Sequence, residues 1–82
     1  MYANYSQIER ALITLTPFTG NSSRGVWEGN GSDREYCVYS YSTLIATYNT
    51  FGRATMKARK YSQTTSRLQN IIRKAWTDLQ EV

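Results

Sequence analysis

The sequence predicts an α+β fold: a small antiparallel sheet of three to four strands packed against a C-terminal amphipathic helix, with a short N-terminal helix. Three observations predict this class. Apolar residues near the C-terminus recur at the spacing of one helix face, the middle of the chain is rich in residues that favour strands, and an Asn-Gly pair at 30–31 separates two such stretches.

The length of 82 residues fits one domain, 1–82, with a thin core. Within that domain we expect an N-terminal helix or arm over 1–17, the antiparallel sheet over 24–61 and the C-terminal helix over 65–80. No internal repeat divides the chain further.

The C-terminal helix is predicted by a continuous apolar stripe. Its members stand at i, i+3, i+4, i+7, i+8 and i+11, and they are Leu68, Ile71, Ile72, Ala75, Trp76 and Leu79. Ser66 followed by Gln69 matches a capping box, and the hydroxyls of Thr64 and Thr65 are alternative acceptors for the free first-turn amides. We expect Trp76 in the stripe, and Trp27 in a strand, to belong to the core.

The N-terminal helix is predicted by a second capping-box pattern, Ser6 followed by Glu9, and by apolar residues at helical spacing that continue until Pro17. Its β-branched residues weaken the helical pattern, so a strand over 11–16 stays open as the alternative. The following stretch, PFTGNSSRG, is typical of a loop because it combines Pro, Gly, Asn and Ser.

The sheet is predicted from a strand, a tight turn and a second strand, with the sequences GVWEG, NGSD and REYCVYSY. Asn30-Gly31 suits a primed hairpin turn, which requires positive φ angles. The residues STLIATYNT then form either a third strand after a turn near 41–43 or a bent extension of the second, and we favour the turn. After a turn at 49–52, TMKARKY alternates as a last strand, and its charged face suits a sheet edge.

The composition and the first residues of the sequence indicate the cellular compartment in which we expect the protein. No stretch approaches the roughly 20 apolar residues of a membrane helix. The start MYANYSQIER has no basic segment followed by an apolar run, so we expect no secretory signal. Cys37 is the single cysteine and has no partner for an internal disulfide. A reducing cytoplasm is the expected location.

The net charge of +4 is concentrated in one part of the chain. Up to position 52, three arginines stand against four acids. From 53 to 74 there is no acid at all, and the seven cations there are Arg53, Lys57, Arg59, Lys60, Arg67, Arg73 and Lys74. Such a block creates a positive field that attracts polyanions or an acidic protein surface, although a solvated face kept soluble by charge has the same composition.

Most catalytic chemistry is excluded. The chain has no histidine, the commonest general base and metal ligand, and its acids form no metal-binding cluster. The glycines match neither GxGxxG nor GxxxxGK[ST], and Cys37 reads as a small core residue. We therefore expect no enzyme, no cofactor and no metal. One catalytic alternative stays open, a small basic nuclease that uses Lys57, Arg59, Tyr61 and Arg67.

Three segments carry a resemblance to a known group of proteins: FTGNSSRGVW, REYCVYSYSTLIATYN and KYSQTTSRLQNIIRKAW. With their F-x-GNS, YxVxSYxTxIA and YSxTTSRxQ elements, they resemble a family of short uncharacterised proteins encoded by bacteriophages and prophages. The resemblance covers positions 18–76. Leu68 stands where the family pattern has a histidine, and Ser23 where a methionine is common, so any function of that histidine is absent here.

The resemblance implies a phage accessory protein in the bacterial host cell, and it brings no activity. By analogy with other small phage proteins, we expect a non-catalytic, stoichiometric, anti-CRISPR-like inhibitor of a host defence protein or nucleoprotein complex. The expected binding residues are Arg53, Lys57, Arg59, Lys60, Tyr61, Arg67, Arg73 and Lys74.

The alternative function is a small DNA- or RNA-binding accessory protein, with bases stacked on Tyr36, Tyr39 or Tyr61. A third possibility, a small virion or assembly component, is favoured only if the chain oligomerises. The sequence fixes neither the target nor the oligomeric state.

Overall fold

The computed structural model describes residues 2–82 and contains two helices and six strands. A short 3₁₀ helix, η1, covers Gly31–Asp33. The α-helices and strands in chain order are α1 Tyr5–Thr14, β1 Phe18–Thr19, β2 Ser23–Glu28, β3 Glu35–Ser40, β4 Thr43–Asn49, β5 Ala54–Met56, α2 Gln63–Ala75 and β6 Gln80–Glu81.

The six strands form one sheet in the order β1-β2-β3-β4-β5-β6, which confirms the α+β class. All neighbours are antiparallel except β5 and β6, which are parallel because the α2 crossover joins them. The predicted sheet of three to four strands is too small. The two additional strands, β1 and β6, are two residues each, too short to give a periodic pattern in the sequence.

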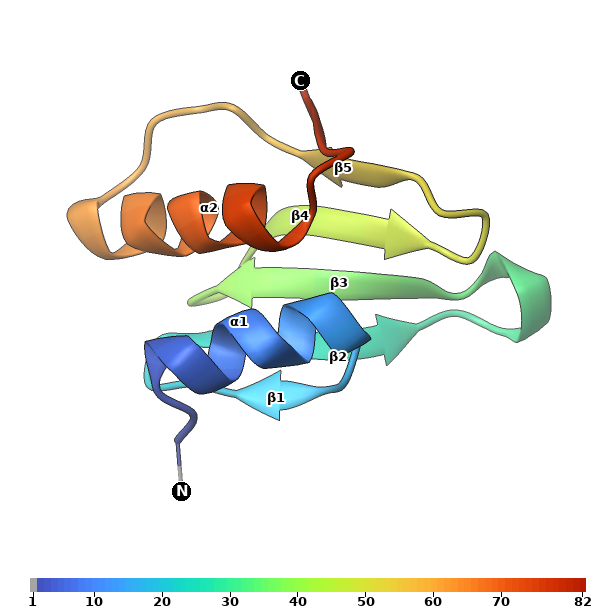
Figure 1. Ribbon diagram of the computed structural model, residues 1–82, viewed down its shortest axis with the longest axis horizontal. Helices are drawn as coiled ribbons and strands as arrows, with labels where there is room; N and C mark the ends of the chain where they lie inside the picture. Colours follow the sequence, from blue (N-terminus) through green and yellow to red (C-terminus); the bar gives the residue numbers. More distant parts are fainter. Residues whose placement is uncertain (1) are drawn as a thin grey trace.

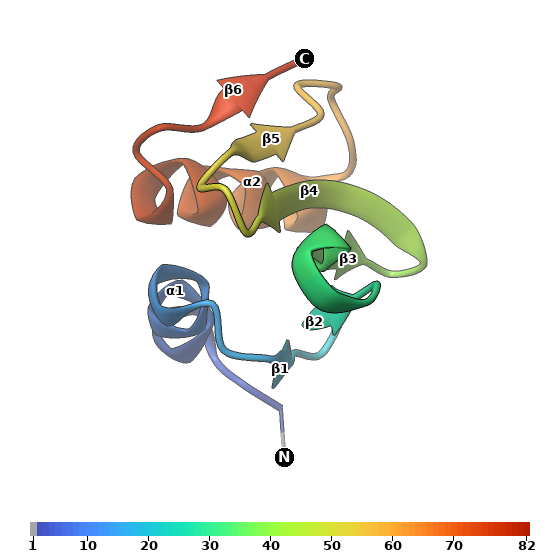
Figure 2. The same ribbon diagram turned by 90° about the vertical axis from the view of Figure 1, so that its right-hand side faces the viewer.

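Both helices cover the same face of the sheet, which curves around them from β1 beside α1 to β6 beside α2 (Figures 1 and 2). The helices run in the same direction. Arg67 near the start of α2 lies over the ring of Tyr5 at the start of α1, and Trp76 at the end of α2 donates to the Leu12 carbonyl near the end of α1. The first turns of both helices therefore lie at one end of the molecule.

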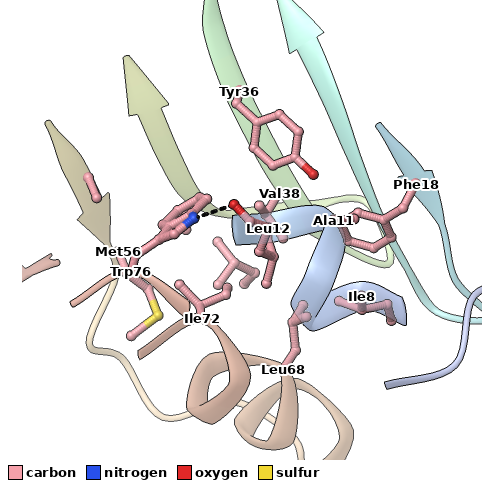
Figure 3. Packing of buried hydrophobic residues seen from close by; sticks show 13 residues of the cluster. Ile8, Ala11, Leu12, Phe18, Tyr36, Val38, Met56, Leu68, Ile72 and Trp76 are labelled. Atoms are coloured by element: carbon pink, nitrogen blue, oxygen red, sulfur yellow. Dashed lines mark hydrogen bonds between the residues drawn. The ribbon is translucent and has the colours of Figure 1, made fainter. Parts of the chain in front are cut away.

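The core lies between the helices and the sheet (Figure 3). Ile8 and Leu12 on α1 meet Leu68 and Ile72 on α2, and all four are buried. Trp76 is buried as predicted, and Trp27 is partly buried against the same cluster. The stripe predicted for the C-terminal helix is therefore the packing surface of α2.

Aromatic rings fill the core toward the helix C-termini. Trp27, Tyr36, Trp76 and Tyr48 form a chain of edge-to-face contacts with centroid distances of 5.6, 6.1 and 5.2 Å. Three of these side chains also donate to main-chain carbonyls of Leu12, Leu15 and Thr16, at or just after the end of α1. The last carbonyls of a helix lack the full set of partners within it, so the aromatic donors add hydrogen bonds at the end of α1, where the Leu12 carbonyl also accepts from the Leu15 amide.

Both helices begin earlier than the capping boxes in the sequence predict. The cap of α1 is Asn4, whose side chain accepts from the Gln7 amide at 2.8 Å while the Gln7 side chain accepts from the Asn4 amide, so Ser6 is not the cap. The cap of α2 is Ser62, whose hydroxyl accepts from the Thr65 amide. In each case a polar residue shortly upstream competes with the predicted one for the same role.

The end of α2 also differs from the prediction. The helix ends at Ala75 instead of continuing to 80, and Leu79 packs against the core from the segment that leads into β6. The stripe is thus continuous in space although the last of its residues is not helical.

The turn between β2 and β3 is not the predicted primed hairpin turn. Asn30 has φ −129°, in the extended region, and positive φ values fall on Gly29 and Gly31. The connection is a longer loop with one 3₁₀ turn, although β2 and β3 pair in the predicted antiparallel arrangement. The predicted turn before the third strand is confirmed, because β4 starts at Thr43.

The last predicted strand is mostly wrong. The strand β5 ends at Met56, and the residues from Lys57 to Ser62 form an irregular segment that leads to α2. The predicted sheet edge is covered by β6, because the Val82 amide donates to the Met56 carbonyl and the Ala58 amide donates to the Val82 carbonyl. The loop predicted over 17–25 is likewise shorter, since it contains β1 and the first residues of β2.

Among residues 2–82, no helix has the length and apolar character needed to span a membrane.

Candidate functional site: a basic end with exposed tyrosines

One end of the molecule gathers cations from several segments. This helix-start end comprises residues 2–8, 20–24, 41–42 and 57–67, that is, the first turns of both helices, two tight turns and the segment after β5. It carries no acid, and its five cations are Arg24, Lys57, Arg59, Lys60 and Arg67. A positive field at this end is therefore not cancelled locally.

Hydrogen bonds hold these segments together. The Tyr41 amide donates to the Ser22 carbonyl, and the Ala3 amide donates to the Thr19 carbonyl at 2.8 Å. The hydroxyls of Ser40, at the end of β3, and Thr65, in the first turn of α2, are 2.7 Å apart and buried. The two turns, the chain start and α2 are thus joined at this end by specific contacts.

The segment 57–62 is held in place by a buried glutamine. The side-chain amide of Gln69, which is 3% exposed, donates to the carbonyls of Lys57 and Arg59 at 2.9 and 3.1 Å. In addition, the Lys57 amide donates to the Ile45 carbonyl in β4. The basic side chains of this segment therefore extend from a fixed backbone, which reduces the entropy lost on binding.

The two helix starts add positive potential. The free amides of a first turn carry about half a positive charge, and acids near them are usually favourable. The first turns of α1 and α2 contain no acid. This absence leaves both dipoles uncompensated beside the cations.

Cations at this end contact tyrosine rings. The guanidinium of Arg67 lies 5.3 Å from the Tyr5 ring centre, and that of Arg59 lies 5.9 Å from the Tyr61 ring centre. Both distances are within the range of cation–π attraction. Such contacts orient an arginine without neutralising it, so its donors stay available to an anion.

The structure brings together five of the eight predicted binding residues and separates the other three. Lys57, Arg59, Lys60, Tyr61 and Arg67 belong to the helix-start end. Arg53 lies in the turn between β4 and β5, before β5 rather than after it. Arg73 is engaged by Glu81 through two hydrogen bonds of 3.0 and 2.8 Å, and Lys74 is exposed in the last turn of α2.

Sequence reasoning missed four residues of this end: Arg24, Tyr2, Tyr5 and Tyr41. They lie outside the basic block, in segments that only the fold brings beside it. A signal existed for Tyr41, because a tyrosine in a predicted tight turn cannot be explained by core packing.

Of the predicted stacking tyrosines, Tyr36 is unsuited to that role, and Tyr39 already contacts a cation. Tyr36 is fully buried and donates its hydroxyl to the Thr16 carbonyl at 2.7 Å, so a base cannot reach its ring. Tyr39 is partly exposed on the sheet face opposite the helices. Its ring lies under the Arg24 guanidinium, and its hydroxyl donates to Glu28.

The residues 2–82 offer little to a catalytic mechanism that needs a metal or a thiolate. No group of three or more potential ligands among them lies close enough to hold a metal ion. Cys37 is buried, and burial together with the charges of Glu28 and Glu35 raises the pKa of its thiol to about 11. At neutral pH this thiol is protonated and a poor nucleophile.

Comparison with known protein families identifies the family of this chain. Residues 2–78 match the sequence model of DUF8033, a family of unknown function. The chain belongs to this family. Comparison of this DUF8033 chain with curated proteins and with solved structures gave no match. The family description assigns no activity, so the phage origin and the binding partner expected from the sequence stay predictions.

Proposed function

We propose that this DUF8033 protein is a non-catalytic phage accessory protein that binds a host defence nucleoprotein complex in the bacterial cytoplasm and inhibits it stoichiometrically. The helix-start end is the binding surface. The observation that carries the proposal is the gathering of five cations, two uncompensated helix starts and exposed tyrosines at an end without acids. Polyanionic partners are favoured by such a field.

The positive charge of the surface limits which part of a nucleoprotein complex it can bind. A chain of charge +4 is a poor mimic of duplex DNA, which would require a strongly acidic surface. Inhibition through this end therefore involves contact with the nucleic acid of the complex or with an acidic protein face.

The proposal is tested by a pull-down from host lysate, with and without nuclease, followed by an inhibition assay on the captured complex. The variant K57E/R59E reverses two cations of the helix-start end. The matched control R53E/K74E reverses two exposed cations outside it, with the same change in net charge. We expect K57E/R59E to lose capture and inhibition and R53E/K74E to retain both. Equal behaviour of the two variants would contradict the assignment of the surface.

The second candidate is a small DNA- or RNA-binding accessory protein that needs no host protein. The exposed tyrosines beside the cations favour it, because bases stack on such rings while phosphates contact the cations. Its signature is affinity for free nucleic acid whose logarithm falls by about 0.7–0.9 per phosphate neutralised for each decade of salt. In the pull-down, loss of every captured protein after nuclease treatment would favour this candidate over the inhibitor.

A further inference from the structure

The helix-start end also has a groove that is lined by other residues than the basic segment 57–62. The groove has a volume of about 280 Å³ and lies between Tyr2 and Tyr41, with the Gly20–Ser23 turn and Arg24 completing its lining. The two tyrosines flank the turn because Ala3 bridges to Gly20 and the Tyr41 amide donates to the Ser22 carbonyl. The GNS part of the F-x-GNS element thus lines the groove, while Phe18 lies in the core.

The rings of Tyr2 and Tyr41 are largely exposed. The side chains of Tyr2 and Tyr41 are 62% and 63% exposed, and neither hydroxyl has a hydrogen-bond partner among residues 2–82. Exposed apolar surface that lines one groove is typical of a binding site.

The backbone at Tyr41 supports a selected role for this side chain. Its φ is 56°, in the left-handed region, where glycine or asparagine is favoured in a two-residue turn. A tyrosine there costs conformational energy that a glycine would avoid. The geometry of the turn therefore does not explain the choice of tyrosine, which is consistent with a role of the ring in binding.

The chemistry around the rings defines the ligand. Aromatic side chains bind a flat π-system by stacking, and the side chains of Asn21, Ser22 and Ser23 provide hydrogen-bonding groups in the lining. Arg24, held over the Tyr39 ring at 4.3 Å, places a cation at the margin of the groove. A flat, hydrogen-bonding group attached to a negative charge fits this arrangement. The groove is smaller than the roughly 300 Å³ lower limit of sites for drug-sized ligands, which suits one ring system.

We infer that the groove between Tyr2 and Tyr41 stacks a nucleobase of a single-stranded nucleic acid, whose phosphates run toward the cations of the helix-start end. This inference rests on the proposed function and deepens it by naming the ligand of one part of the surface. A base in a duplex is already stacked and paired, so the ligand is a single strand or an unpaired end.

The test compares two labelled oligomers of equal length, an oligothymidylate and an abasic oligomer with the same phosphates, by fluorescence anisotropy with untagged protein. Stacking contributes about 1–3 kcal/mol per base, so the wild type should bind the oligothymidylate about 5- to 150-fold more tightly. The variant Y2A/Y41A should bind both oligomers as the wild type binds the abasic one. Y41F, which keeps the ring, should retain the preference.

Two controls separate stacking from charge. F51A removes an aromatic side chain that is 84% exposed in the β4–β5 turn, and it should leave both affinities unchanged. K57E/R59E should weaken binding to both oligomers and reduce the salt dependence, while their affinity ratio persists.

Several outcomes would overturn the inference. One is equal affinity of the wild type for both oligomers. The other is a preference for the oligothymidylate that persists in Y2A/Y41A, when circular dichroism shows that this variant is folded. Salt-dependent binding without base preference would overturn the groove assignment and leave the proposed function in place. Binding of neither oligomer, with nuclease-resistant capture of a host complex, would do the same and identify a protein as the partner.

Discussion

The two ends of the molecule use aromatic residues in opposite ways. At the end where both helices stop, Trp27, Tyr36 and Trp76 lie within or against the core and donate to the carbonyls that follow or end α1. At the helix-start end, Tyr2 and Tyr41 are exposed and make no hydrogen bond through their hydroxyls within 2–82. Aromatic side chains therefore stabilise the fold at one end, whereas at the other end they are exposed to solvent and accessible to a ligand.

Charge follows the same division. The opposite end, made of residues 28–35, 49–53 and 77–78, carries the four acids Glu28, Asp33, Glu35 and Asp78 against Arg34 and Arg53. The helix-start end has only cations. This separation aligns with the dipoles of two parallel helices, so the charged side chains and the backbone produce a field of the same direction. The proposed binding surface and the chain of aromatic core residues therefore lie at different ends of this small domain.

Removing an aromatic side chain should have its largest effect on stability at the helix-stop end. Trp76→Ala should lower the free energy of unfolding by about 3–5 kcal/mol, because it leaves a cavity and removes one of the two hydrogen bonds that the Leu12 carbonyl accepts. Tyr41→Ala at the other end should change it by less than about 0.5 kcal/mol. Urea unfolding of both variants gives the two values. If they are similar, the comparison between the ends is wrong.

Gln69→Leu should have an intermediate effect and act on the helix-start end. It removes two part-buried hydrogen bonds to the carbonyls of Lys57 and Arg59, each of which contributes about 0.5–1.5 kcal/mol. Amide hydrogen exchange over 57–62 should become faster, and binding should weaken. Asn49→Ala is the matched change at the other end, where the Asn49 side chain accepts from the amides of Phe51 and Arg53. Asn49→Ala should leave exchange over 57–62 unchanged.

The role of Gln69 explains which parts of the fold the sequence could predict. The stripe from Leu68 to Trp76 predicts a helix because burial imposes its spacing. The start of that helix was misplaced because Gln69 fits a capping box locally, whereas its side chain is needed by the backbone of Lys57 and Arg59. Such a requirement arises only in the folded chain. Cap chemistry alone cannot choose between Ser62 and Ser66.

The site was predictable only where it is continuous in the sequence. Lys57, Arg59 and Lys60 could be found because they follow one another. Arg73 was wrongly grouped with them as a free cation, since its partner Glu81 lies in a strand of two residues that no pattern marks. Arg24 and Tyr41 reach the site through the order of the strands, which the sequence did not specify.

Tyr41→Gly separates stability from binding at one position. The free energy of unfolding should rise by up to about 1 kcal/mol, because glycine adopts the observed φ of 56° without the steric cost that tyrosine has. The preference for a base over an abasic site should fall at the same time. Urea unfolding and the oligomer comparison measure the two effects. A loss of stability would instead mean that the Tyr41 ring supports the fold.

The pKa of the Cys37 thiol should respond to the acids near it. This is the smallest of the expected effects, because the thiol is protonated at neutral pH. Burial first, and the charges of Glu28 and Glu35 after it, raise the pKa of the thiol from about 9 to about 11. Because the folded state binds this proton more tightly than the unfolded state, the contribution to stability is complete below pH about 9 and is lost as the pH rises toward 11.

The rate of Cys37 alkylation against pH measures this shift. The folded wild type should react slowly at pH about 8, where an unperturbed thiol is partly ionised, and faster near 11. In Glu35→Gln the profile should move to lower pH by a small amount only, since burial is the larger cause. An unchanged profile would show that the charge of Glu35 does not reach the thiol, whereas a full return to the ordinary pKa would show that charge, rather than burial, is the main cause. In Cys37→Ala, the part of the decrease in stability between pH about 9 and 11 that comes from the thiol should disappear.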